Sequence, residues 1–302
     1  MRKDVFRLTV LLACAALATS RLGLIGHELI GHGGAALLCG ARISDVQLFW
    51  FAGGWIRYRL PEPSFASALF ITMAGIALEL VVGLALAIFA RGASLGRHIV
   101  RGIGMALVLH ATWYLATGAF HGFGDGLLLY RWLGGARIPV AIAAGLVTCG
   151  ATFLGAREVV GTLASTVSRR FAGTLVAFVL AGGFHAALTI GELRLRRDPT
   201  YVETMKPERE RVIAQELATW EKAQRTQITP EAKRVEAAKI AQAHPTFPFV
   251  WILALCTALA AFFGIVKTKR PPPQSIPDAL LVRFIVLAVA SVGLVIAIST
   301  LG

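Results

Sequence analysis

The stretch "GLIGHELIGHGGAALLCG" (Gly23–Gly40) places two histidines and a glutamate in an otherwise apolar segment. It nearly matches the motif H-E-x-x-H, in which two histidines four residues apart on a helix bind zinc and the glutamate acts as a base. Here the second histidine comes one residue late, because three residues instead of two separate Glu28 from His32. Whether His27 and His32 can face one metal ion therefore depends on the local helix geometry.

At about 100° per residue, side chains at i and i+4 lie about 40° apart around an α-helix, whereas those at i and i+5 lie about 140° apart. A regular helix would therefore point His27 and His32 in different directions. A π-helical turn absorbs one extra residue and returns i and i+5 to one face, and Gly31 within the turn eases the distortion. We predict such a widened turn near residues 29–31. The alternative is a regular helix in which Glu28 and His32, at i and i+4, form the ligand pair.

The rest of the chain has the composition of a multi-spanning membrane protein. Of its 302 residues, 56% are hydrophobic, and several apolar runs reach the roughly 20 residues that a helix needs to cross a bilayer. The formal net charge is +13, and in such a protein Lys and Arg lie in loops, where they hold topology and contact anionic lipid. No soluble basic face stands out, so the lipid bilayer is an expected partner and nucleic acid is not. We expect a multi-pass protein of the cell membrane, which in a bacterium is the inner membrane.

The hydropathy pattern predicts an α-helical polytopic membrane protein with about eight transmembrane helices. A membrane-associated β-hairpin is expected after the second helix, at 41–63, because aliphatic, aromatic and polar residues alternate there around a Gly-Gly pair. The expected spans are residues 5–20, 22–39, 65–90, 99–120, 138–156, 171–193, 247–266 and 280–301.

These elements group into four parts. Residues 1–137 form a transmembrane core that contains the histidine motif and the hairpin. Additional transmembrane helices follow at 138–193, and a soluble insert of two or three amphipathic helices is expected at 194–246, which is rich in Glu, Lys, Arg, Ala and Gln. The C-terminal transmembrane helices occupy 247–302.

Ionisable side chains inside membrane spans are costly to insert and are functional candidates by default. His27, Glu28 and His32 fall within six residues, and such a cluster costs several kcal/mol unless its members are paired or liganded. Four other ionisable residues have simpler explanations. His110 and His185 are isolated on apolar helices, where a hydrogen bond between helices explains them better than a metal does. Glu158 and Glu192 lie beside arginines and are expected at the membrane interface.

Three segments together resemble the site-2 protease family of intramembrane zinc metalloproteases. "HELIGHGGAALLCGARISDVQLFWFAGG" (27–54) is similar to the H-E-x-G-H helix of that family and the β-hairpin that follows it. "MAGIALELVVG" (Met73–Gly83) is similar to its A-G-P-x-x-N segment. "ATGAFHGFGDG" (Ala116–Gly126) is similar to its N-x-x-P-x-P-x-L-D-G motif, whose aspartate is the third zinc ligand. The order, the spacing and the intervening hairpin agree over about residues 5–133.

The chain departs from the family pattern in each segment. The first has the extra residue between its histidines. In the second the Ala-Gly pair is retained, but Ile76 replaces the proline and Glu79 replaces the asparagine that the family uses near substrate. In the third only Asp125 and the following glycine remain, and the asparagine and the two prolines are replaced by Thr117, Phe120 and Gly122.

The resemblance implies an intramembrane zinc metalloprotease that hydrolyses peptide bonds in or near transmembrane segments of membrane-protein substrates. It implies that His27, His32 and Asp125 are the zinc ligands and that Glu28 is the catalytic general base. Asp125 would then have to come within ligand distance of the two histidines. The implied partner is a transmembrane segment of another protein.

Two further residues extend the predicted site. His121 lies four residues before Asp125, so on a helical turn both could face the metal. We therefore consider His121 either as a metal ligand or as a residue that contacts Asp125, and not the metal, and polarises its carboxylate. Glu79, at the asparagine position of the second segment, is a candidate substrate-binding residue.

The main alternative is a catalytically inactive, family-derived membrane protein, either a pseudoprotease or a metal-binding scaffold, that binds transmembrane partners. The degenerate second and third segments favour this alternative, whereas the retained His-Glu, His and Asp favour the enzyme. A transporter is a third reading, since charged residues in the membrane also line ion paths. No inverted repeat is visible in the sequence, which argues against a transporter.

Overall fold

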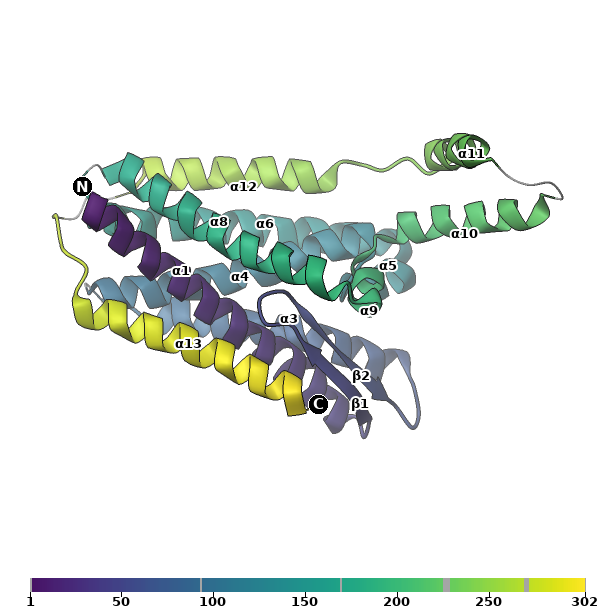
Figure 1. Ribbon diagram of the computed structural model, residues 1–302, viewed down its shortest axis with the longest axis horizontal. Helices are drawn as coiled ribbons and strands as arrows, with labels where there is room; N and C mark the ends of the chain where they lie inside the picture. The colour runs from purple at the N-terminus through teal and green to yellow at the C-terminus, as the bar shows by residue number, and fades with distance from the viewer. Residues whose placement is uncertain (1, 93, 169, 225–228, 269–271, 302) are drawn as a thin grey trace.

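The computed structural model describes residues 2–92, 94–168, 170–224, 229–268 and 272–301. It is mostly helical, with one two-stranded sheet (Figure 1). Within the described ranges, six helical stretches are long and apolar enough to cross a membrane. They are Lys3–Leu38, Phe65–Phe89, Leu95–Ala164, Phe171–Arg196, Phe249–Val266 and Asp278–Thr300. The structure thus agrees with the predicted class of a helical multi-pass membrane protein.

The stretch Leu95–Ala164 is longer than a single crossing needs. Its 70 residues would extend about 105 Å as a single helix, far more than the roughly 30 Å of a bilayer core. It contains two long helices, α4 (Leu95–His121) and α6 (Arg137–Gly155), which pack against each other. The short α5 (Gly126–Leu133) and a 3₁₀ turn, η2 (Gly134–Ala136), connect them. A second π-helical segment, η3 (Ala156–Val160), and α7 (Gly161–Ala164) follow α6.

The first helix differs from the prediction. The spans expected at 5–20 and 22–39 form one continuous helical stretch, made of α1 (Arg2–Ile25), the π-helical η1 (Gly26–Gly33) and α2 (Gly34–Leu38). Arg21, which separates the two apolar runs in the sequence, is buried inside the protein. Its guanidinium donates to the carbonyl oxygens of Phe49 and Phe51, at 2.8 and 3.0 Å. The arginine therefore does not end a helix, because hairpin carbonyls satisfy it within the fold.

The predicted hairpin is confirmed. Strand β1 (Arg42–Leu48) pairs antiparallel with β2 (Gly54–Arg59), with Leu48 opposite Gly54. The chain then enters α3 (Phe65–Phe89), whose N-terminus is capped by Ser64.

The C-terminal half supplies three more long helices and the insert. They are α8 (Arg170–Arg196), α12 (Phe249–Val266) and α13 (Asp278–Leu301). The insert folds into the helices expected at 194–246, namely α9 (Pro199–Met205), α10 (Glu208–Ala223) and α11 (Pro230–Ala243). Figure 1 shows α10 and α11 extending past the ends of the transmembrane helices.

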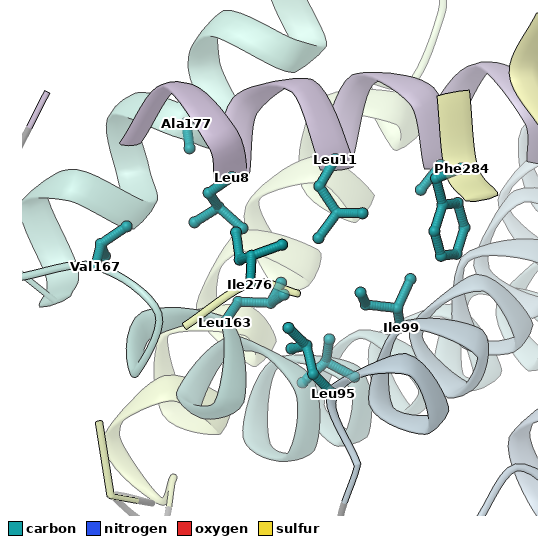
Figure 2. Close-up of a cluster of buried hydrophobic side chains, with 11 residues drawn as sticks. Leu8, Leu11, Leu95, Ile99, Leu163, Val167, Ala177, Ile276 and Phe284 are labelled. Atoms are coloured by element: carbon teal, nitrogen blue, oxygen red, sulfur yellow. The ribbon is translucent and has the colours of Figure 1, made fainter. Parts of the chain in front are cut away.

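A buried apolar cluster holds the N-terminal half of α1 in place (Figure 2). Leu8 and Leu11 of α1, both 0% exposed, lie at its centre. Because lipid is as apolar as these side chains, close packing is what favours their contact inside the protein. The helix that carries the histidines is thereby fixed against four other elements, through Leu95, Ile99, Leu163, Val167, Ala177, Ile276 and Phe284.

Candidate metal centre

The histidine motif lies in a π-helical segment, as predicted. Residues Gly26–Gly33 wind as π-helix between two α-helical segments. Gly31 lies where this segment meets α3, and a Cβ added there would be 2.5 Å from the Cα of Gly75. Only glycine allows the two backbones to approach so closely. The alternative of a regular helix with Glu28 and His32 as the ligand pair is therefore wrong.

The π-helical turn brings the two imidazoles together. The ring centroids of His27 and His32 are 4.7 Å apart, and the rings are nearly perpendicular. Asp125, 98 residues after His27, lies between them. Its Oδ2 is 3.0 Å from His27 Nε2, and its Oδ1 is 3.4 Å from His32 Nε2. One ligand atom from each of the three residues can be chosen so that all lie within 4.8 Å of one another, and this group can hold a metal ion.

A sharp turn after α4 delivers Asp125 to this position. Gly124 has a φ of +51°, a conformation that glycine adopts readily and a larger residue would strain. A Cβ at Gly124 would also collide with the hydroxyl of Tyr114, because the two atoms would be only 1.8 Å apart. That hydroxyl accepts a hydrogen bond from the backbone N–H of Asp125, at 3.3 Å.

The Nδ1 atoms of the two histidines face away from Asp125 toward other partners. His32 Nδ1 lies 2.7 Å from the carbonyl oxygen of Ile71. Because a carbonyl only accepts, Nδ1 carries the proton, which leaves a lone pair on Nε2 for a metal. His27 Nδ1 lies 3.5 Å from Oε1 of Glu79, slightly beyond a normal hydrogen bond.

Glu79 connects this site to α4. Its side chain is 6% exposed, and its Oε2 accepts a hydrogen bond from Nδ1 of His110, at 2.9 Å. The hydrogen bond between helices that we predicted for His110 is confirmed, and its partner is Glu79 on α3. Glu79 also lines the cavity described below. Its side chain therefore contacts both His27 and the interior of the cavity.

Glu28 is 8% exposed and lies next to the two histidines in the same segment. Its carboxylate forms no hydrogen bond with any part of the chain that the structure describes. It lines a cavity of about 890 Å³ together with His27, His32 and Asp125. This volume is in the range of pockets that enclose a small ligand. The cavity is bounded by α1, the hairpin, α3, α4, α8 and α9.

The residues present fit a divalent metal ion. Two imidazoles and one carboxylate form the donor set of many catalytic zinc sites, which keep a fourth position open for water. Ligand bonds of about 2.0–2.2 Å in a tetrahedron place neighbouring donor atoms about 3.4 Å apart. The His–Asp separations of 3.0 and 3.4 Å match that spacing closely. A divalent cation would also offset the charges of three neighbouring carboxylates, Glu28, Glu79 and Asp125.

Two predicted roles do not match the structure. His121 is not part of the metal group, because α4 ends there and the ring lies against Phe120 and Phe249 instead. Glu192, whose place at the membrane interface stays a prediction, is 6% exposed, and its carboxylate accepts the backbone N–H groups of residues 50–52. The hydrogen bond predicted for His185 is absent, since its Nδ1 is buried without a partner in the described ranges.

Sequence reasoning missed several residues around the site. Tyr114 supports Asp125 from the preceding helix, and nothing in its sequence context pointed to that contact. For Arg21 the signal was present, because an arginine inside a long apolar run is itself a functional candidate. Tyr201 reaches the cavity from the insert, where no motif marks it.

Comparisons with protein-family models, curated proteins and solved structures returned no match.

Proposed function

We propose that the protein is an intramembrane zinc metalloprotease that hydrolyses peptide bonds in or near transmembrane segments of membrane-protein substrates. The observation that carries this proposal is the π-helical turn. It offsets the extra residue between His27 and His32 and directs both Nε2 atoms to Asp125, beside the buried Glu28. Such turns occur frequently at functional sites, since they give up regular hydrogen bonds.

In the proposed mechanism His27, His32 and Asp125 hold the zinc ion. When bound, zinc lowers the pKa of a coordinated water toward neutrality and polarises the scissile carbonyl. Glu28 accepts the proton of the attacking water on its carboxylate and then delivers it to the nitrogen of the leaving amine. Its free carboxylate, which faces the cavity without a hydrogen-bond partner among the described residues, suits this role.

The substrate in this proposal is an extended, locally unwound segment. Strand β2 lines the cavity through residues 54–58, and among the described residues it pairs with β1 alone. A substrate strand added to β2 would obtain main-chain hydrogen bonds there and pass close to Glu28. We further propose the inner membrane of a bacterium as the location, because bacterial outer membranes hold β-barrels in place of helical bundles.

The test compares zinc content and cleavage in three forms of the purified protein. Glu28→Gln should keep stoichiometric zinc and lose cleavage of transmembrane substrates, because an amide is nearly isosteric but takes no proton at neutral pH. Asp125→Asn, the matched control, should lose or weaken zinc binding, because it removes a charged ligand. Full cleavage by the Gln variant would show that Glu28 is not the base.

One observation favours the inactive alternative. The direct contact of 3.0 Å between His27 and Asp125 satisfies both side chains without a metal. A pseudoprotease would use this contact as a structural link between the π-helical segment and the turn after α4. Purified, unmutated protein without stoichiometric zinc would support that reading.

A further inference from the structure

The helix α9 of the insert forms part of the cavity wall. Two residues separate it from the end of α8, and Figure 1 shows it between α8 and α10. Four of its residues line the cavity that contains the metal group: Thr200, Tyr201, Thr204 and Met205. An insert that the sequence indicates to be merely solvated therefore reaches the candidate site.

On one side α9 contacts the turn of the hairpin. The ring of Tyr201 lies against that of Phe49, with centroids 5.0 Å apart. A Cβ at Gly53 would be 2.8 Å from the same tyrosine ring, so the ring fills the space over the turn. Arg57 donates to the hydroxyl of Thr200 at 2.7 Å. Burial raises the pKa of the Tyr201 hydroxyl above its ordinary value, so this contact is made by a neutral ring.

On the other side α9 contacts the turn that holds Asp125. The backbone N–H of Gly124 donates to the carbonyl oxygen of Thr204, at 3.0 Å. The seven residues of α9 thus connect the hairpin, where we expect substrate, with the loop that supplies a metal ligand.

The hairpin turn and α9, which face each other across this part of the cavity, differ in how many buried hydrogen bonds hold them. The hairpin turn is clamped from within, because the carboxylate of Glu192 accepts three backbone N–H groups and Arg21 donates to two carbonyls. By contrast, the residues of α9 are half-buried or exposed, and its hydrogen bond from Arg57 is exposed. Exposed polar contacts contribute little to stability, so α9 is the side that can move.

Helix α9 is also connected to the rest of the insert. Arg211 of α10 donates to the carbonyl of Glu203, at 2.6 Å. Glu208, in the first turn of α10, forms a two-point ion pair with Arg131 of α5, both contacts being 3.0 Å. The first turn of α10 therefore contacts both α9 and α5.

We propose that α9 is a movable wall of the cavity and that Tyr201 is the residue that limits entry to it. The segment that enters is the extended peptide of the proposed function, and to that extent the inference rests on it. Displacement of Tyr201 from Gly53 opens the cavity beside the hairpin turn.

The test measures access to the cavity directly. Thr72, which lines the cavity, is replaced by cysteine in full-length protein whose native Cys39, Cys149 and Cys256 are replaced by alanine. The rate at which a water-soluble maleimide modifies Thr72→Cys is then measured. The retained Cys14 is half-buried against the apolar cluster of Figure 2, and an increase in its own modification rate reports unfolding of that cluster.

Tyr201→Ala should raise the modification rate of Thr72→Cys several-fold without changing that of Cys14, whereas Tyr201→Phe should leave both unchanged. Val202→Ala is the matched control, because Val202 is on the same helix, is 50% exposed and does not line the cavity. Should Tyr201→Ala prove unstable, Tyr201→Val, which also removes the ring from Gly53, takes its place and should raise the rate as well. An unchanged rate in Tyr201→Ala or, if that variant unfolds, in Tyr201→Val would overturn the proposal.

This experiment is independent of proteolysis, since maleimide modification needs neither zinc nor cleavage. An inactive protein in which Tyr201→Ala speeds modification would refute the protease and leave the movable wall standing. An active protease in which the rate is unchanged would refute the movable wall alone.

Discussion

Deleting Ile30 is the most direct test of the π-helical turn. The deletion leaves the sequence H-E-L-G-H, in which the two histidines stand at i and i+4. Because the π-helical segment contains one residue more than an α-helix would need, the deletion should convert it to α-helix and leave both flanking helices in place. Ile30 is 62% exposed, so little packing is lost. We expect zinc affinity to remain within about 10-fold of the unmutated protein.

The matched control deletes Leu22, which lies in the regular part of the same helix and is also exposed, at 43%. There the deletion rotates the residues that follow Leu22, including both histidines, by about 100° around the helix axis and shifts them by about 1.5 Å along it. A side-chain atom about 5.5 Å from the helix axis then moves about 8 Å. The separations from Asp125 are only 3.0 and 3.4 Å, so the ligand set should be lost.

The assay is zinc affinity by chelator competition, with circular dichroism to confirm that each variant is folded. Loss of zinc in the Leu22 deletion should exceed the roughly 10–100-fold that follows removal of a residue supporting a ligand. If both deletions abolished zinc binding equally, the π-helical segment would not contain one residue more than an α-helix needs, and that explanation of the turn would be wrong. If both kept it, the histidines would not be ligands.

Three other variants probe the surroundings of the site. Glu79→Ala should weaken zinc binding about 10–100-fold in the same competition assay, because it removes the carboxylate beside His27; unchanged affinity would argue against this support. Gly31→Ala should lower the melting temperature sharply, since its Cβ would meet the backbone of α3 at 2.5 Å, whereas Gly34→Ala, with nothing within 4 Å, should not. Glu192→Ala should cost about 3–5 kcal/mol and expose the hairpin to proteolysis, because it leaves the backbone N–H groups of residues 50–52 without their acceptor, at about 1–3 kcal/mol each. The exposed Glu203→Ala should change stability by no more than about 0.5 kcal/mol.

Local geometry explains what the sequence by itself determined. Apolar runs of bilayer length predicted membrane-crossing helices, because a helix in lipid must satisfy its own backbone groups. Alternation around two glycines predicted the hairpin, since side chains alternate along a strand. The five-residue spacing of His27 and His32 predicted the π-helical turn, because only a local change of helix pitch returns both residues to one face. Each of these depends on residues close together in the chain.

Contacts between distant residues depend on the tertiary structure. The family resemblance predicted Asp125 at the metal, but hydropathy and residue spacing contain no information on its contact with His27 across 98 residues. That contact forms because α3 packs against both the π-helical segment and α4. The first two spans fused into one helix because hairpin carbonyls satisfy Arg21, and no hydropathy value contains that partner. Likewise α9 has the sequence of a solvated helix, yet Tyr201 reaches the cavity because the end of α8 places it over the hairpin turn. Burial and hydrogen bonding are properties of the assembled fold, so the cost of a buried charge can be read only once its partner is in place.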